Sequence, residues 1–292
     1  MKTLVAIDGS EASFAALGSA CRIAAKTGAY VTALYVNKGG EYSAEEMLWP
    51  GLKERIENEL EASGPKIMAR ASAIGKRLGL QIEGVMAYGV PAEELAKYAA
   101  VRGIVNLIAL GHSSKGKGAQ GFVGSTTRMV VSTAGRAALL VTSREEEIGR
   151  ILVAVDDSEA SLKTAAAAGR LAQSLAAEVR LVSVFPDIDA LRHEYRQIAE
   201  VPNLDKHLAE TRVALREKAC RAVEKAQGIL EPLGLRVSAL VKEGDPPREL
   251  VAESGDAELT AIGLKSTPEQ RKIGRILGTL LNRHEISLLC VQ

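Results

Sequence analysis

Short apolar runs alternate with longer amphipathic or alanine-rich stretches along the whole chain. In the first half these runs are rich in Val, Leu and Ile and occupy residues 3–8, 30–36, 80–87, 105–110 and 137–142. Runs of this length predict strands, and the stretches between them are long enough for crossover helices. Strands joined by such helices pair in parallel, so a parallel sheet covered by helices is expected.

The sequence of the first half returns in the second half. Residues 4–13 read LVAIDGSEAS and residues 152–161 read LVAVDDSEAS, an offset of 152 − 4 = 148. Two later matches keep the order: GVPAEEL at 89–95 with GDPPREL at 244–250, and LIALG at 107–111 with LTAIG at 259–263. A repeat this long is a duplicated domain rather than a solenoid unit. We therefore predict two tandem α/β domains, 1–144 and 149–292, each doubly wound around a mostly parallel five-stranded sheet.

Several local signals predict where helices begin or break. Ser10 and Ser158 are placed to cap the first helix of each copy. Pro65, after a glycine, is expected to kink or split the second helical region of the first copy, whereas residues 204–230 have no such break. Residues 37–50 and 186–202 fit neither strand nor helix and are expected beside the carboxyl edge of each sheet, as lids or as ordinary surface insertions.

Composition narrows the range of partners. The formal net charge is +1 and aromatic residues make up 3%, so no general attraction to nucleic acid or to an anionic membrane is expected. No apolar run approaches the length of a membrane span, and the three cysteines stand far apart, as in proteins of reducing compartments. These features predict a cytoplasmic protein with a local anion site at most.

The richest candidate site is the glycine-rich segment 111–127 after the fourth strand. Gly124 and Ser125 open the next helix, whose free amides suit a phosphate. Two nucleotide motifs fit poorly. The dinucleotide pattern from Gly116 to Gly121 does not begin the first strand-to-helix turn, and the P-loop pattern has Gly118 where Ser or Thr should hold Mg²⁺.

A third pattern fits better. Gly111-x2-Ser114-x9-Gly124-Ser125 resembles the phosphate loop of universal stress proteins that bind ATP, with Ser114 in place of the second glycine. The strand ending in Asp8 and the Gly-Val-Pro at 89–91 also match that family, and the resemblance covers both halves. It implies an adenine nucleotide alpha hydrolase-like fold that binds ATP or another adenine nucleotide, alone or with Mg²⁺.

By the same resemblance, Asp8 and the backbone near Val36 face the adenosine, while the glycine-rich loop faces the phosphates. An Asp in this place is also compatible with a plain turn carboxylate. The residues expected at the nucleotide are Ile7, Asp8, Val36, Leu110, Gly111, Ser114, Gly124, Ser125, Thr126 and Thr127.

The second copy departs from this pattern. Asp157 replaces Gly9, and Gly263 to Gly278 spans 15 positions against 13 from Gly111 to Gly124. Adjacent carboxylates repel an anion unless cations compensate. Lys265, Arg271, Lys272 and Arg275 are candidates for that compensation. We expect a weaker or altered site, with contacts at Asp156, Val184, Gly263, Gly278 and Thr279.

No catalytic residue and no metal site are predicted. The zinc-protease motif begins at His193 and Glu194 but has Gln197 where the second His belongs, and no nucleophile stands in a recognisable context. Three functions stay in competition: a nucleotide-binding regulatory protein sensed by an unidentified protein partner, a scaffold with degenerate sites, and a slow ATPase or self-phosphorylating protein. The apolar last strands, 137–142 and 287–292, need cover, which predicts an internal pseudo-dimer of the two halves, with a homodimer left open.

Overall fold

The computed structural model describes residues 1–37, 52–101, 105–112, 126–127, 129–130, 137–190, 192, 203–264 and 274–292. The chain divides into two compact units. The first comprises Met1–Glu147 with Leu281–Ser287, and the second comprises Ile148–Leu280 with Leu288–Gln292.

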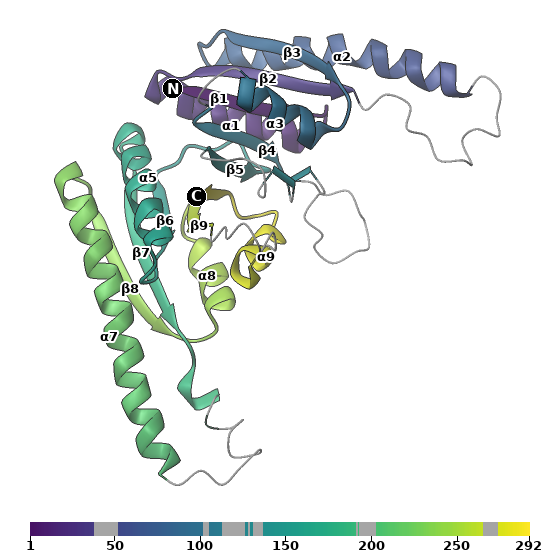
Figure 1. The fold of residues 1–292 in the computed structure, drawn as a ribbon. Helices are drawn as coiled ribbons and strands as arrows, with labels where there is room; N and C mark the ends of the chain where they lie inside the picture. Colours follow the sequence, from purple (N-terminus) through teal and green to yellow (C-terminus); the bar gives the residue numbers. More distant parts are fainter. Residues whose placement is uncertain are drawn as a thin grey trace. The chain divides into compact units, whose positions relative to one another are not determined.

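The first unit contains a five-stranded parallel sheet in the order β3-β2-β1-β4-β5 (Figure 1). The strands are β1 (Lys2–Ile7), β2 (Tyr30–Asn37), β3 (Ile82–Tyr88), β4 (Leu107–Gly111) and β5 (Ala138–Thr142). Each lies within two residues of the apolar run that predicts it. The doubly wound α/β class predicted from the sequence is therefore confirmed for this copy.

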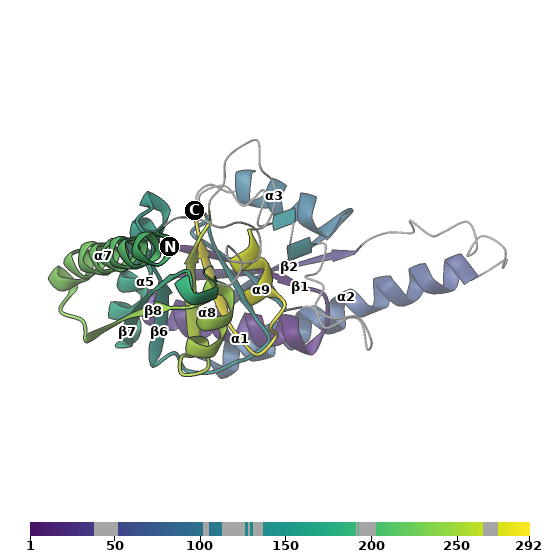
Figure 2. The same ribbon diagram turned by 90° about the horizontal axis from the view of Figure 1, so that it is seen from below.

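Helices cover both faces of this sheet. α1 (Glu11–Thr27) and α2 (Leu52–Arg77) pack against each other and against the strands, and α3 (Pro91–Val101) packs on β1 and β2 (Figure 2). α2 runs through Pro65 without interruption, so the expected split is wrong. Packing against the sheet outweighs the missing hydrogen bond, since Gly64 lies buried and the Ser63 hydroxyl is 3.2 Å from the Tyr35 hydroxyl.

The second unit repeats the arrangement, with strand order β10-β9-β6-β7-β8 and parallel pairing throughout. Its strands are β6 (Arg150–Ala154), β7 (Glu178–Phe185), β8 (Val237–Glu243), β9 (Leu259–Gly263) and β10 (Leu288–Val291). Its helices are α5 (Glu159–Leu175), α7 (Leu204–Leu230), the 3-10 turn η2 (Glu231–Leu233), α8 (Pro246–Ser254) and α9 (Arg275–Leu281). α7 has the bounds predicted from its unbroken pattern.

Each sheet has a switch point that follows from its strand order. In the first sheet β1 has β2 as its neighbour on one side and β4 as its neighbour on the other. In the second sheet β6 lies between β7 and β9 in the same way. At such a point the loops that follow the two neighbouring strands diverge, and ligands of open α/β sheets bind in the crevice between them. Within the described parts of the chain, no helix is both long and apolar enough to span a membrane.

Candidate functional site

The loop after β1 is a tight turn built by its own side chains. A carboxylate oxygen of Asp8 accepts the Ser10 amide at 3.0 Å, and the Ser10 hydroxyl caps α1 by accepting the Ser13 amide at 3.2 Å. The buried Ser13 hydroxyl donates to the Ser10 carbonyl and lies 3.3 Å from the Asp8 amide. Gly9 takes a φ of +85° that favours glycine. Asp8 is thus held, exposed, at the carboxyl end of β1.

The loop after β6 reproduces this turn. Asp156 accepts the Ser158 amide at 3.1 Å, Ser158 caps α5, and Ser161 accepts the Asp156 amide at 3.0 Å. Ser13 and Ser161 are positioning residues that the sequence reasoning missed. The signal for them is the Ser-x-x-Ser spacing that the repeat keeps in both copies.

Gly111 ends β4 against the first turn of α1. A Cβ atom at this position would lie 2.6 Å from the Ser13 nitrogen and 2.7 Å from the carbonyl carbon of Ala12. In the second unit a Cβ atom on Gly263 would lie 3.1 Å from the carbonyl carbon of Ala160, which is a tight contact but a less severe one. At Gly111 only glycine lets the end of β4 come this close to the first turn of α1.

A second glycine turn lies at the carboxyl ends of β2 and β3, on the other side of β1 from β4. The Gly89 amide donates to the Asn37 carbonyl at 3.0 Å, which joins the ends of β2 and β3, and Gly89 has a φ of +133°. Gly244 donates to the Phe185 carbonyl at 2.9 Å in the same way, with a φ of +158°. The carboxyl edge therefore has the same backbone frame in both units, with different side chains on it.

The described site residues of the first unit divide by exposure. Ile7 and Leu110 are buried in the core, so only their backbone can meet a ligand. Val36 and Thr126 are half-buried, and Thr127 is buried. Ser114, Gly124 and Ser125, which carry the phosphate-loop pattern, lie outside the described residues. His112, beside Gly111, is buried, and burial lowers the pKa of its ring, which favours the neutral form.

In the second unit Asp157 has a cation that the sequence reasoning did not find. Lys225 of α7 donates to its carboxylate at 2.6 Å, and this hydrogen bond lowers the pKa of Asp157. Of the four cations proposed for this role, Lys265, Arg271 and Lys272 lie outside the described residues, and Arg275 pairs with Asp245 instead. Lys225 follows Asp157 by 68 residues, so only the fold reveals the pair.

The start of α9 also differs from the expected alignment. Gly278 lies inside the helix with its amide bonded to the Gly274 carbonyl at 2.8 Å, and the Thr279 hydroxyl donates to the Arg275 carbonyl at 3.0 Å. In the helical residues near this point the buried positions are Thr127 and Val130 in the first unit and Leu277 and Leu280 in the second, an offset of 277 − 127 = 150. The same offset pairs Gly124 with Gly274 and Ser125 with Arg275. Gly274, not Gly278, is therefore the glycine that precedes this helix.

The segment after β7 is fixed to the edge it follows. Ile188 is fully buried and its amide donates to the Glu243 carboxylate at 2.9 Å. Arg212 of α7 bonds the same carboxylate at 3.0 Å and that of Asp189 at 2.8 Å. Of the stretch expected to form a lid or a surface insertion, residues 186–190 are thus anchored by ion pairs.

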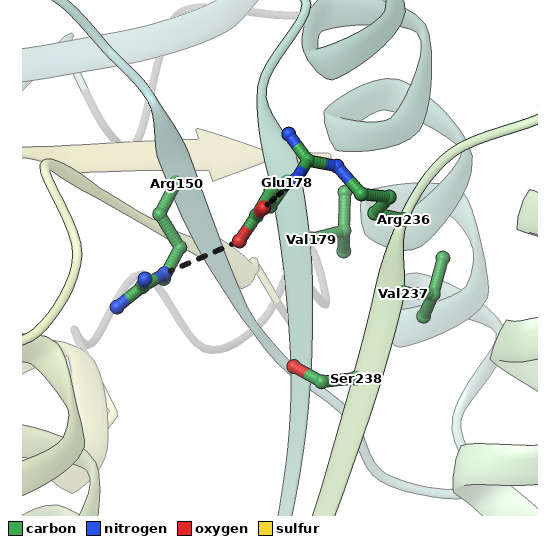
Figure 3. Close-up of a pocket in the computed structure, with 6 residues that line it drawn as sticks. All are labelled: Arg150, Glu178, Val179, Arg236, Val237 and Ser238. Carbon is green, nitrogen blue, oxygen red and sulfur yellow. Dashed lines mark ion pairs between the residues drawn. The ribbon is translucent and has the colours of Figure 1, made fainter.

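A small hollow lies at the opposite, amino-terminal edge of the second sheet (Figure 3). Its volume is about 140 Å³, below the range of about 300–1,000 Å³ that small-molecule sites occupy. Glu178 lies between two arginines there, 2.7 Å from Arg236 and 3.9 Å from Arg150. The hollow is too small for a nucleotide, and its cations are already paired. Among the described residues, no three His, Cys, Asp or Glu side chains gather in a way that could hold a metal ion.

Comparison with known proteins agrees with the duplicated fold. The model of the universal stress protein family matches residues 1–141 and again 147–292. A universal stress protein of Mycobacterium bovis is 25% identical over 96% of this chain and 91% of its own length. One from Bacillus subtilis is 33% identical over 38% of this chain and 77% of its own length.

Solved structures give the same result at the level of the fold. The crystal structure of a universal stress protein from Archaeoglobus fulgidus covers 100% of this chain and 98% of its own, with a TM-score of 0.69 and 15% identity. With a family match over each half, the strand order and the repeated turns have one explanation. The chain belongs to the universal stress protein family and carries two copies of its domain in tandem.

Proposed function

We propose that the first unit binds an adenine nucleotide at the carboxyl edge of its sheet, and that the bound state is read by a protein partner in a stress response. The observation that carries this proposal is the switch point between β1 and β4, where the Asp8 turn follows β1 and Gly111 ends β4. Loops at such a point are where open α/β sheets bind nucleotides.

The described residues suit an adenosine on one side of this edge. Asp8 is exposed and held by the Ser10 amide, so its carboxylate is oriented before any ligand arrives. A fixed carboxylate can accept hydrogen bonds from ribose hydroxyls, and backbone groups at the end of β2, beside Val36, can read the edge of the base. Preorganised groups lose little conformational entropy on binding.

The phosphates are assigned to the loop between Gly111 and Thr127. Gly111 brings the end of β4 against α1, and Thr126 and Thr127 are helical. Unpaired amides at a helix start, with glycine and hydroxyl residues around them, attract phosphate oxygens. Ser114, Gly124 and Ser125 belong to this proposed cradle on the sequence pattern. ATP or another adenine nucleotide fits it, alone or with Mg²⁺.

We place this protein in the cytoplasm as a binding and signalling protein, with at most slow ATP hydrolysis. In the described part of the site, the hydroxyl of Ser10 serves as a helix cap and that of Ser13 bonds the turn, so neither is activated by a base. Binding alone changes the stability of the loops that it orders, and a partner can sense that change.

Release of a co-purified ligand tests the proposal. Protein purified without added nucleotide is heated, and the supernatant is separated on an anion-exchange column against AMP, ADP, ATP and cyclic AMP standards. We expect an adenine nucleotide in the supernatant, and a rise in melting temperature when ATP is added to the stripped protein. A supernatant without nucleotide, together with an unchanged melting temperature at millimolar ATP, would reject the proposal.

A further inference from the structure

The carboxyl edge of the second unit is more acidic than that of the first. At four matched positions the second unit has acids, where the first has one acid and three uncharged residues. The second set is Asp156, Asp157, Glu243 and Asp245, and the first set is Asp8, Gly9, Tyr88 and Val90. Four carboxylates around a phosphate-binding site disfavour an anionic ligand unless cations are available to it.

The cations described at this edge already have carboxylate partners. Lys225 lies 2.6 Å from Asp157, and Arg212 lies 2.8 Å from Asp189 and 3.0 Å from Glu243. A phosphate would have to displace these carboxylates to reach the positive charges. Displacement leaves an unpaired acid beside the bound anion, so the exchange is unfavourable.

One ion pair joins the two loops between which a nucleotide would lie. Arg275, at the start of α9, pairs with Asp245, in the turn between β8 and α8. At the matched places the first unit has Ser125 and Val90, which cannot form an ion pair. We call the Asp245–Arg275 pair the latch. It joins the phosphate side of the edge to the turn after β8.

The hydroxyls of the phosphate loop are also replaced. The 150-residue offset sets Ile276 and Leu277 where the first unit has Thr126 and Thr127. Leu277 is buried, and Thr279, a hydroxyl residue of α9, bonds its own helix. At these two helix positions the second unit thus has no hydroxyl for a phosphate, and at the four matched positions it has more negative charge.

We propose, building on the nucleotide binding proposed for the first unit, that the second unit is closed to nucleotides by its own ion pairs. The latch joins the two sides of its carboxyl edge, and among the described residues the Asp157–Lys225 and Glu243–Arg212 pairs hold two cations that a phosphate would otherwise attract. The protein then binds one nucleotide per chain, and the second copy keeps the family fold without its ligand.

Isothermal titration of ATP into four full-length proteins tests this inference. They are the wild type, Gly124→Asp, the latch-open variant, which carries Asp157→Gly, Glu243→Tyr, Asp245→Val and Arg275→Ser, and Gly124→Asp combined with these latch-open changes. Arg275→Lys, which keeps the charge pair, is the matched control. Circular dichroism and a urea transition establish that each variant is folded.

We expect one ATP per chain for the wild type and for Arg275→Lys, none for Gly124→Asp, two for the latch-open variant and one for the combined variant. Two ATP per wild-type chain, or one in Gly124→Asp, would overturn the inference. So would a folded latch-open variant that binds no more ATP than the wild type. Failure of the nucleotide binding proposed for the first unit would give a different result. In that case the wild type binds no ATP, whereas the latch-open variant binds one ATP per chain.

Discussion

Replacing Gly111 with alanine is expected to lower the free energy of unfolding of the first unit by about 3 kcal/mol. The added methyl group would lie 2.6 to 2.8 Å from backbone atoms of Ala12 and Ser13, which cannot rotate away as a side chain can. β4 and the first turn of α1 must then separate, and the core around them loosens. A fall in melting temperature of roughly 6–12 °C follows for a unit of this size.

Gly228→Ala is the matched control for this prediction. Gly228 lies within α7, and a Cβ atom there meets no other atom within 4 Å. Alanine favours a helix over glycine by about 1 kcal/mol, so this variant should be slightly stabilised. Differential scanning calorimetry measures both changes. If Gly111→Ala has the same melting temperature as the wild type, Gly111 does not lie as close to Ala12 and Ser13 as described.

Gly124→Asp is expected to weaken ATP binding by roughly 100- to 1,000-fold. A carboxylate at the start of the phosphate-binding helix occupies the place of the phosphate and repels it. Two like charges 4 Å apart near a protein surface repel by about 4 kcal/mol, and about 1.4 kcal/mol corresponds to tenfold in affinity. Fluorescence titration with a labelled ATP analogue, with unlabelled ATP as competitor, measures the change.

The second copy supplies the control for this substitution. Gly274 precedes α9 at the matched position, and a Cβ atom there would meet no atom within 4 Å, so we expect Gly274→Asp to leave the fold intact. We expect its ATP affinity to equal that of the wild type. Equal loss in the two variants would mean that both copies bind nucleotide. Unchanged ATP affinity in Gly124→Asp would show that the glycine-rich loop does not contact the nucleotide.

The sequence predicts most of the fold because its signals are local and occur twice. The buried strands are continuous apolar runs, and both Ser10 and Ser158 cap the helices that they precede. The predicted split at Pro65 was wrong, because the propensity of a single residue was given too much weight. Contacts between distant segments, here Ser63 and Gly64 with β2 and β3, are absent from the local pattern and outweigh it.

The candidate site was only partly predictable. The Asp8 turn follows from its motif, but its hydrogen bonds to Ser10 and Ser13 require coordinates. Gly278 was aligned wrongly because the loop in the second copy has a different length and more than one glycine near its end. The Lys225 and Arg212 pairs join segments far apart in the chain, so no local spacing indicates them.

Hydrogen exchange with and without ATP, followed by mass spectrometry of the full chain, tests the central claim most directly. Bound nucleotide should slow exchange in residues 8–13, 89–94 and 111–127, because the ligand orders the loops around the switch point of the first unit. Residues 156–161, 244–249 and 274–279 should exchange at the same rate in both samples. Protection confined to the second set, or absent from both at saturating ATP, would contradict the account.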